Sequence, residues 1–206
     1  MNIFAVDKNP VISATNLCDK HVVKMIVESC QLLSTAHRIL DGYQTTVLNK
    51  AGRPRKIYKL MDPELENKLC KFVMPNHPCA IWARETTSNY VWLAKHNLAL
   101  CDEYQHRYNK THSMESLAVL LHEQLPNNIP IDELTEFVQA MPTQYKMPNP
   151  VLGYRYYYCY EKSRFAKWKN NNIPSWYTDL HNLKEHVKQS GVDVEINAPD
   201  MIKHGL

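Results

Sequence analysis

Helical periodicity is the feature that most constrains this chain, because it extends over two segments far longer than an ordinary strand. We expect the first long helix over residues 11–40, ended by Gly42. Its apolar stripe recurs at spacings of four and seven residues and consists of Val22, Ile26, Leu33 and Leu40. Such a stripe lies on one side of a helix and must be buried against another element.

A second segment of this kind, residues 80–109, is rich in aromatic side chains and is predicted to pack against the first. The chain has 5 glycines against 12 prolines in 206 residues, which suits long helices joined by proline-marked loops better than tight hairpins. The hydrophobic fraction of 44% is enough for a core. We therefore expect an all-α fold: a single-domain helical bundle over residues 1–190, with two long helices and a basic aromatic C-terminal helix. A tail would follow at 191–206.

The rest of the chain is predicted as shorter helices and loops. Asp62-Pro63-Glu64 should begin a helix, because an N-cap residue, a proline at the first helical position and an early carboxylate agree. Further helices are expected at residues 113–124, 131–140, 152–169 and 177–189. Irregular structure is expected at 44–59, a basic loop, and at 141–150, which carries three prolines. The apolar opening at residues 3–6 is the one candidate strand.

Cysteine and histidine usage argues against disulfides and metals. The six cysteines are scattered without a Cys-x-x-Cys pair, as reduced core residues are. The ten histidines form no His-Glu-x-x-His motif and no compact cluster with ligand spacing, so we expect no metal and no cofactor. No run approaches the ~18 apolar residues of a membrane span, and the N-terminus does not resemble a signal peptide. We expect a soluble cytoplasmic protein with no membrane partner.

Positive charge gathers near the C-terminus. Residues 144–172 carry six cations against Glu161 alone, a balance of +5 in a chain of formal net charge +3. Aromatic residues alternate with these cations, and nucleic acid uses both, since cations neutralise phosphates and rings stack on bases. The predicted DNA-binding residues are Arg155, Tyr156, Tyr157, Lys162, Arg164, Lys167, Trp168 and Lys169. The alternative is an amphipathic helix whose aromatics are core and whose lysines coat the outside.

The first long helix carries the densest chemistry. Helical spacing places His21, Lys24 and Glu28 on one side, opposite much of the apolar stripe. An imidazole, an amine and a carboxylate within two turns suit general acid/base or Schiff-base chemistry, provided that neighbours desolvate them. A solvated surface with an ion pair between Lys24 and Glu28 remains the alternative.

The string Leu17-Cys18-Asp19-Lys20-His21, with Glu28 seven residues after the histidine, resembles the first helix of the phage pyrimidine-dimer DNA glycosylases. These enzymes are also called endonuclease V, and they have bacterial relatives. His77-Pro78 followed by Trp82 and Tyr90 is similar to a His-Pro-x-x-x-Trp element of those relatives. A broader likeness, to proteins carried by large tailed phages, spans most of the chain. If the protein is phage-encoded, it would act in the host cytoplasm.

The resemblance implies a compact all-α enzyme that acts on double-stranded DNA with an extruded base, on which Trp82 and Tyr90 are candidates to stack. It also implies that an α-amino group attacks the sugar C1′. Glu28 would then assist glycosidic cleavage and stabilise the Schiff base before strand scission. Asp19 and His21 match supporting positions.

The chain also departs from the family's pattern. Two arginines around the glutamate are replaced by Val27 and Gln31, and Asn2 is bulkier than the family's second residue. The amine is therefore that of Met1, or Lys20 or Lys24 takes its place.

Three functions stay open at this point. The first is a DNA glycosylase or AP-lyase-like enzyme acting on a pyrimidine in DNA. The second is a phage DNA hypermodification transferase that joins an amine or amino acid to an activated 5-hydroxymethyl pyrimidine. The third is a DNA-binding or host-interaction protein without chemistry.

Overall fold

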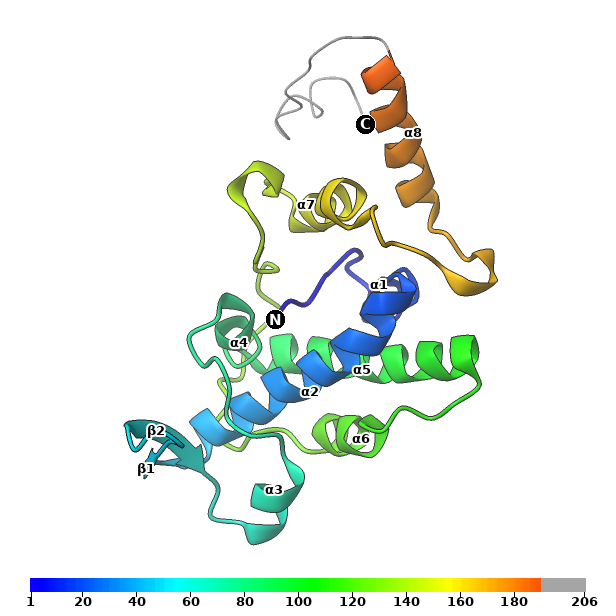
Figure 1. The fold of residues 1–206 in the computed structure, drawn as a ribbon. Coiled ribbons are helices and arrows are strands. Elements are labelled where there is room, and N and C mark those ends of the chain that lie inside the picture. Colours follow the sequence, from blue (N-terminus) through cyan, green and yellow to red (C-terminus); the bar gives the residue numbers. More distant parts are fainter. Residues whose placement is uncertain (190–206) are drawn as a thin grey trace.

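Two long helices cross at the centre of the structure. In the computed structural model, which describes residues 1–189, α2 (Asp19–Leu40) packs against α5 (Thr87–Tyr108) (Figure 1). The fully buried side chains of this pair include Val22, Ile26 and Leu33 from α2 and Leu93 and Leu100 from α5. The predicted packing of two long helices is therefore confirmed.

Shorter elements surround this pair. The helices are α1 (Pro10–Thr15), α3 (Pro63–Lys68), α4 (Pro78–Trp82), α6 (Glu115–Glu123), α7 (Pro150–Tyr157) and α8 (Ser175–Gln189). Single helical turns occur at η1 (Thr143–Tyr145), η2 (Tyr158–Lys162) and η3 (Lys169–Asn171). Within residues 1–189 the sheet structure is one antiparallel hairpin of β1 (Tyr43–Leu48) and β2 (Pro54–Lys59), so the all-α class is confirmed. No helix in this range is long and apolar enough to cross a membrane.

Each of the two predicted long helices is divided in two. A continuous helix would pair the Asp19 N–H with the Thr15 carbonyl. Instead, Asp19 donates to the Lys167 carbonyl at 2.8 Å, and Thr15 accepts from the buried Arg107 guanidinium at 2.9 Å. Likewise, α5 starts separately from α4 because the Thr86 hydroxyl accepts the Asn89 N–H and caps the helix. The apolar periodicity runs through both breaks and conceals them.

The basic loop predicted at residues 44–59 is wrong, since the segment forms the β1–β2 hairpin. Its strands pair from Tyr43 with Lys59 to Leu48 with Pro54, and Gly52 adopts φ +70° in the turn. The β-branched run Thr45-Thr46-Val47 was the strand signal that the basic composition obscured.

The helix predicted at residues 131–140 is also wrong. That segment runs extended along the N-terminal end of α5, where Pro130 accepts the Thr87 N–H at 2.8 Å. Thr135 donates its N–H to the Asn89 side chain at 2.9 Å. These hydrogen bonds replace those of a helix, and Ile131 is 95% exposed.

The C-terminal aromatic helix is shorter than predicted. After α7 the chain makes one π-helical turn, η2, and then continues irregularly to Trp168, whose indole N–H donates to the Asn16 carbonyl at 3.0 Å. The predicted helix starts near residues 62, 113 and 177 are confirmed to within two residues by α3, α6 and α8. The segment at residues 141–150 is irregular, as predicted, apart from the single turn η1. The tail predicted at 191–206 lies outside the described residues.

The apolar opening of the chain is a core segment rather than a strand. Residues 3–6 are buried between α2 and α7 (Figure 1). The Arg155 guanidinium of α7 donates to the Val6 carbonyl at 2.7 Å, and the Phe4 ring stacks on His21 of α2. This threading brings the first residue of the sequence to the middle of α2.

Candidate active site

The N-terminal segment, α2 and the chain after α7 enclose a cavity of about 280 Å³. It is lined by Met1, Asn2, Phe4, Lys20, His21, Lys24, Glu28, Lys162 and Phe165. Four of the five predicted catalytic residues are among them, and the fifth, Asp19, is not. The structure therefore brings most of the predicted set to one hollow, together with groups from the other end of the chain.

Glu28 holds the start of the chain against this cavity. Its Oε2 accepts the Asn2 N–H at 3.0 Å and lies 4.0 Å from the Met1 amino nitrogen. Its Oε1 lies 3.0 Å from the Lys24 Nζ. The Glu28 side chain is only 12% exposed, whereas that of Lys24 is 67% exposed. The carboxylate is thus largely shielded from water while an amino group stays within its reach.

Asn2 fixes where that amino group lies. Its side-chain oxygen accepts the N–H groups of Ile3 at 2.8 Å and Phe4 at 3.1 Å, and its amide donates to the Ala140 carbonyl at 2.9 Å. Phe4 has φ +44°, a left-handed conformation that is unfavourable for a large side chain. The Asn2 turn and the stacking of Phe4 hold it there. Sequence reasoning treated Asn2 only as too bulky, although asparagine is a preferred residue for such turns.

His21 is buried, so the alternative of a solvated helix face does not hold for this residue. It is 6% exposed, its ring centroid lies 4.2 Å from that of Phe4, and its Nδ1 is hydrogen-bonded to the Tyr158 hydroxyl. Burial, aided by the charges of Lys162 and Lys24, lowers the pKa of His21 to about 3. At neutral pH the ring is uncharged, so it supports the wall of the cavity rather than supplying an imidazolium.

We expect His21 to make folding less favourable in acid. Its folded pKa of about 3 lies below the unfolded value near 6.5, so the unfolded chain binds the proton first. The contribution of the uncharged His21 to the free energy of unfolding is complete above pH 6.5. It is lost as the pH falls towards 3, by about 1.4 kcal/mol per pH unit. His21→Phe keeps the ring but cannot titrate. The free energy of unfolding, measured with urea, should fall between pH 7 and pH 5 by about 2 kcal/mol less in His21→Phe than in the parent.

The exposed His106 provides the matched control, and His106→Gln should leave the pH dependence unchanged. Equal losses in the parent and in His21→Phe would contradict the buried, uncharged state of His21.

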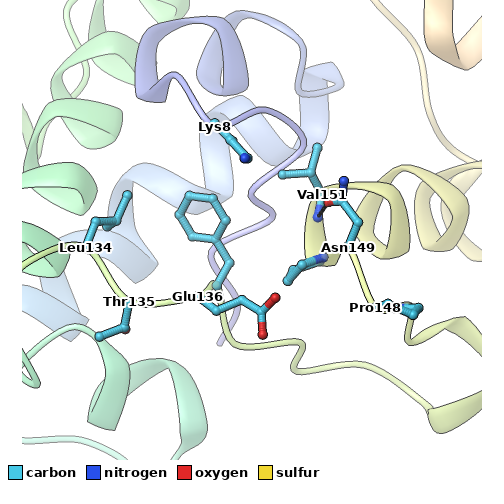
Figure 2. Close-up of a pocket in the computed structure, with 9 residues that line it drawn as sticks. Lys8, Leu134, Thr135, Glu136, Pro148, Asn149 and Val151 are labelled. Carbon is cyan, nitrogen blue, oxygen red and sulfur yellow. Dashed lines mark hydrogen bonds between the residues drawn. The ribbon is translucent and has the colours of Figure 1, made fainter.

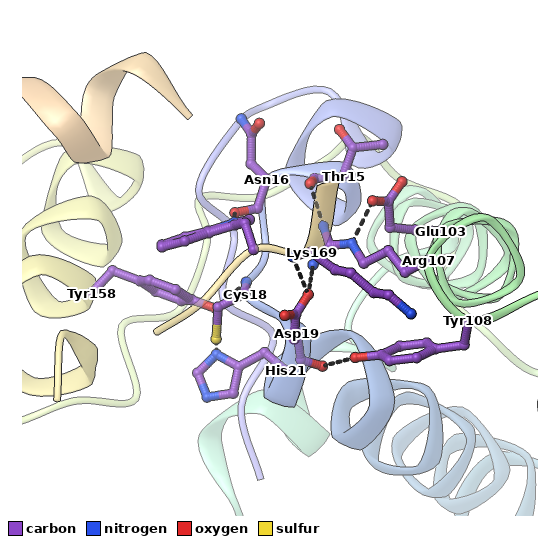
Figure 3. Close-up of polar contacts among 11 residues, drawn as sticks. Thr15, Asn16, Cys18, Asp19, His21, Glu103, Arg107, Tyr108, Tyr158 and Lys169 are labelled. Atoms are coloured by element: carbon purple, nitrogen blue, oxygen red, sulfur yellow. Dashed lines mark hydrogen bonds and ion pairs between the residues drawn. The ribbon is translucent and has the colours of Figure 1, made fainter. Parts of the chain in front are cut away.

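Asp19 belongs to a separate polar network (Figure 3). Its Oδ1 accepts from the Arg107 guanidinium at 2.8 Å and from the Lys169 backbone N–H at 3.0 Å. Arg107 also donates to Glu103 at 2.6 Å and to the Thr15 carbonyl. Asp19 therefore ties the start of α2 to α5 and to the chain after α7, outside the cavity.

The predicted DNA-binding residues divide into exposed and packed groups. Arg164, Lys167 and Lys169 are exposed, and the half-buried Lys162 lines the cavity and donates to the hydroxyl of the half-buried Tyr157 at 2.9 Å. The buried residues are Tyr156, at 3% exposed, and Trp168, at 7%.

Arg155 is engaged inside the protein. Besides donating to the Val6 carbonyl, its guanidinium pairs with Asp7 at 3.2 Å. Three of the eight predicted residues, Arg155, Tyr156 and Trp168, therefore hold the fold together rather than facing a ligand.

The two rings predicted to stack on a base are in the core. Tyr90 is fully buried, with its hydroxyl 2.9 Å from His37 Nε2 and donating to the Leu121 carbonyl at 3.0 Å. Trp82 is 3% exposed and packs against Trp92 and Phe137. Tyr90 therefore offers no open side to a base. Trp82 has one edge at an open cavity of about 570 Å³, which shares no residue with the Glu28 cavity. Phe165, which the prediction left out, lines the cavity with the Lys20 Nζ 5.1 Å from its ring centroid.

A larger cavity of about 400 Å³ shares no residue with the Glu28 cavity. Lys8, residues 134–137 and residues 148–151 line it (Figure 2). Asn149 is already committed to capping α7, since its side chain accepts the Val151 N–H at 3.0 Å. In the part of the chain that the structure describes, no three His, Cys, Asp or Glu side chains are placed to hold a metal ion. The Glu28 cavity is the candidate active site because it brings together a carboxylate, the first residue of the chain and three lysines.

One comparison with known families gave a match. The family model described as pyrimidine dimer DNA glycosylase matches residues 1–116, which include Met1, Asn2, Lys24 and Glu28 of the cavity. Comparisons with curated proteins and with solved structures gave no match. The match covers more than half of the 206 residues, and its members' substrate is DNA. The chain belongs to the pyrimidine dimer DNA glycosylase family.

Proposed function

We propose that the protein cleaves the glycosidic bond of a pyrimidine in double-stranded DNA, and that the Met1 amine is its nucleophile. The observation that carries this proposal is the position of Glu28, which bonds the Asn2 N–H and lies 4.0 Å from the Met1 nitrogen at the wall of the cavity. An amine next to a shielded carboxylate is the pair that Schiff-base chemistry at a sugar carbon requires.

The reaction begins when the amine gives up a proton and its lone pair becomes available. The nitrogen then attacks C1′, the C1′–N bond to the base breaks, and the base leaves with the bonding electrons and takes up a proton. Opening of the sugar ring gives an iminium ion between Met1 and C1′, whose positive charge the Glu28 carboxylate stabilises. Loss of a C2′ proton and of the 3′ phosphate cleaves the strand, and hydrolysis of the iminium releases the enzyme.

Cations and a ring around the cavity suit an extruded nucleotide. Lys20, Lys24 and Lys162 line it together with Phe165, so phosphates flanking the target can meet ammonium groups while a base meets an aromatic ring. Lys20 and Lys24 are also amines, which makes the identity of the nucleophile a question for experiment. The Met1 nitrogen is favoured because Asn2 fixes its position, whereas Lys24 is mostly in solvent.

Borohydride trapping tests this assignment. The protein is incubated with duplexes that contain an abasic site, a thymine dimer or 5-hydroxymethyluracil, and reduction should convert the iminium into a stable adduct. Peptide mass spectrometry should place the adduct on Met1. A variant with two residues added before Met1, which moves the amine away from Glu28, should trap at least about 100-fold less, the scale of a lost nucleophile.

Other outcomes would change the assignment. An adduct on Lys20 or Lys24 would keep the lyase reaction and reject the Met1 nucleophile. No adduct on any duplex, with a mass increase on the base when phage metabolites are added, would replace the lyase by the transferase.

A further inference from the structure

A second basic surface lies on the β1–β2 hairpin. Residues 43–59 contain five cations, Lys50, Arg53, Arg55, Lys56 and Lys59, and no carboxylate. This segment and residues 144–172 each carry +5, so a formal net charge of +3 leaves −7 for the rest of the chain. The hairpin is therefore as basic as the C-terminal segment, in a protein that is otherwise acidic.

Packing does not account for most of these cations. Arg55 has a structural role, since its guanidinium donates to the Phe72 carbonyl at 3.2 Å, and Tyr58 anchors the hairpin through its ring contact with Phe72. By contrast, Lys50, Arg53 and Lys56 are exposed, and their side chains extend from the hairpin into solvent. Cations gathered on an exposed hairpin repel one another, which favours binding to a polyanion.

The hairpin continues the side of α2 that carries the active site. Glu28, Thr35 and Arg38 lie on one side of α2 at spacings of seven and three residues. Segment 70–77 covers this side beyond Glu28, because Thr35 and Arg38 donate to the carbonyls of residues 73 and 70 at 3.3 and 2.7 Å. His77, at the end of the segment, is within electrostatic reach of the Met1 amine and Glu28. Further along this route, the exposed Lys71 lines a cavity together with Arg38 and Arg55.

The spacing fits duplex DNA. From Glu28 to Leu40, where α2 ends, the helix rises roughly 18 Å at 1.5 Å per residue, and Figure 1 shows the hairpin at that end, away from α7. B-DNA advances about 3.4 Å per base pair along each strand. A duplex with its target base at Glu28 would therefore pass the hairpin on the order of 5–10 base pairs away.

We propose that the β1–β2 hairpin is a second DNA-contact element, in which Lys50, Arg53 and Lys56 bind phosphates of the duplex on one side of the target base. The proposal rests on the proposed function for the position of that base. It adds a contact at a distance, which holds the duplex along α2 while the cavity receives the extruded nucleotide.

Binding to duplexes of different length tests the proposal. Fluorescence anisotropy compares the parent with the triple variant Lys50→Gln/Arg53→Gln/Lys56→Gln on a duplex with about 15 base pairs on each side of an abasic analogue. Two further duplexes are shortened to about 4 base pairs on one side or the other. For the parent, shortening one particular side should weaken binding. For the triple variant, that shortening should have no effect, and the slope of log K against log salt should be flatter by about 2–3 units.

The variant Arg164→Gln/Lys167→Gln is the matched control, because it removes exposed cations on the other side of the cavity. It should weaken binding to long and shortened duplexes alike. If the triple variant bound DNA with the affinity and salt slope of the parent, the hairpin contact would be rejected, but the proposed chemistry would stand. A parent that binds duplexes without forming any adduct would reject the chemistry and keep the hairpin contact, whereas no binding at low salt would reject both.

Discussion

Glu28→Gln should lower turnover on a dimer-containing duplex by about two orders of magnitude or more, the scale of a lost acid/base group. Folding and DNA affinity should change little, since glutamine keeps the shape of the side chain and its amide oxygen can still accept the Asn2 N–H. What the variant loses is the negative charge beside the Met1 amine. Without that charge the attacking nitrogen has no adjacent proton acceptor, and the iminium ion has no counterion.

The burial of Glu28 strengthens this expectation. A carboxylate that is 12% exposed acts through a medium less polarisable than water, so its field at a cation 4.0 Å away is larger than at the surface. A neutral side chain cannot replace that field. Single-turnover kinetics with saturating enzyme separate this loss from any change in binding.

Glu64→Gln is the matched control, because it makes the same chemical change at an exposed ion pair with Lys68 on α3. Its turnover should equal that of the parent. Full activity in Glu28→Gln would remove the catalytic assignment, even if the variant trapped an adduct on Met1.

Sequence periodicity predicted the two long helices because their buried stripes repeat over many turns. It could not predict the break at residues 16–18, which depends on Lys167 and Arg107, two residues more than 80 positions away in the chain. Residues 131–140 illustrate the same limit. Their composition permits a helix, but the N-terminal groups of α5 and the Asn89 side chain offer their backbone better partners.

The candidate site was predictable where spacing within one helix carried the information. The interval between His21 and Glu28 led to the family and to the carboxylate at the cavity. The hydrogen bond from Asn2 to Glu28 was not predictable, because Asn2 reaches the cavity only through the threading of the N-terminus between α2 and α7. His21 shows why a helical wheel is insufficient: a polar residue opposite one apolar stripe is buried when a second layer covers it.

Asp19 is another residue whose contacts outside α2 were not predictable. The resemblance predicted a supporting role in catalysis, but its contacts with Arg107 and Lys169 indicate that it stabilises the fold. Arg107→Leu tests this role. The Arg107 side chain is fully buried, and its partners Glu103 and Asp19 are 9% and 24% exposed. Removing only the cation leaves the Glu103 carboxylate buried without a counterion and frees the Thr15 carbonyl. The free energy of unfolding should fall by about 3–5 kcal/mol, as measured by urea denaturation.

A double variant separates the lost charge from the lost packing. In Arg107→Leu/Glu103→Leu both buried charges are replaced by apolar side chains, so part of the lost stability should return. Where these variants are folded, their single-turnover rate should stay near that of the parent, unlike that of Glu28→Gln, because Asp19 lies outside the cavity. A loss below about 1 kcal/mol in Arg107→Leu would contradict the structural role of the network. A turnover defect as large as that of Glu28→Gln in the folded protein would return Asp19 to the catalytic group.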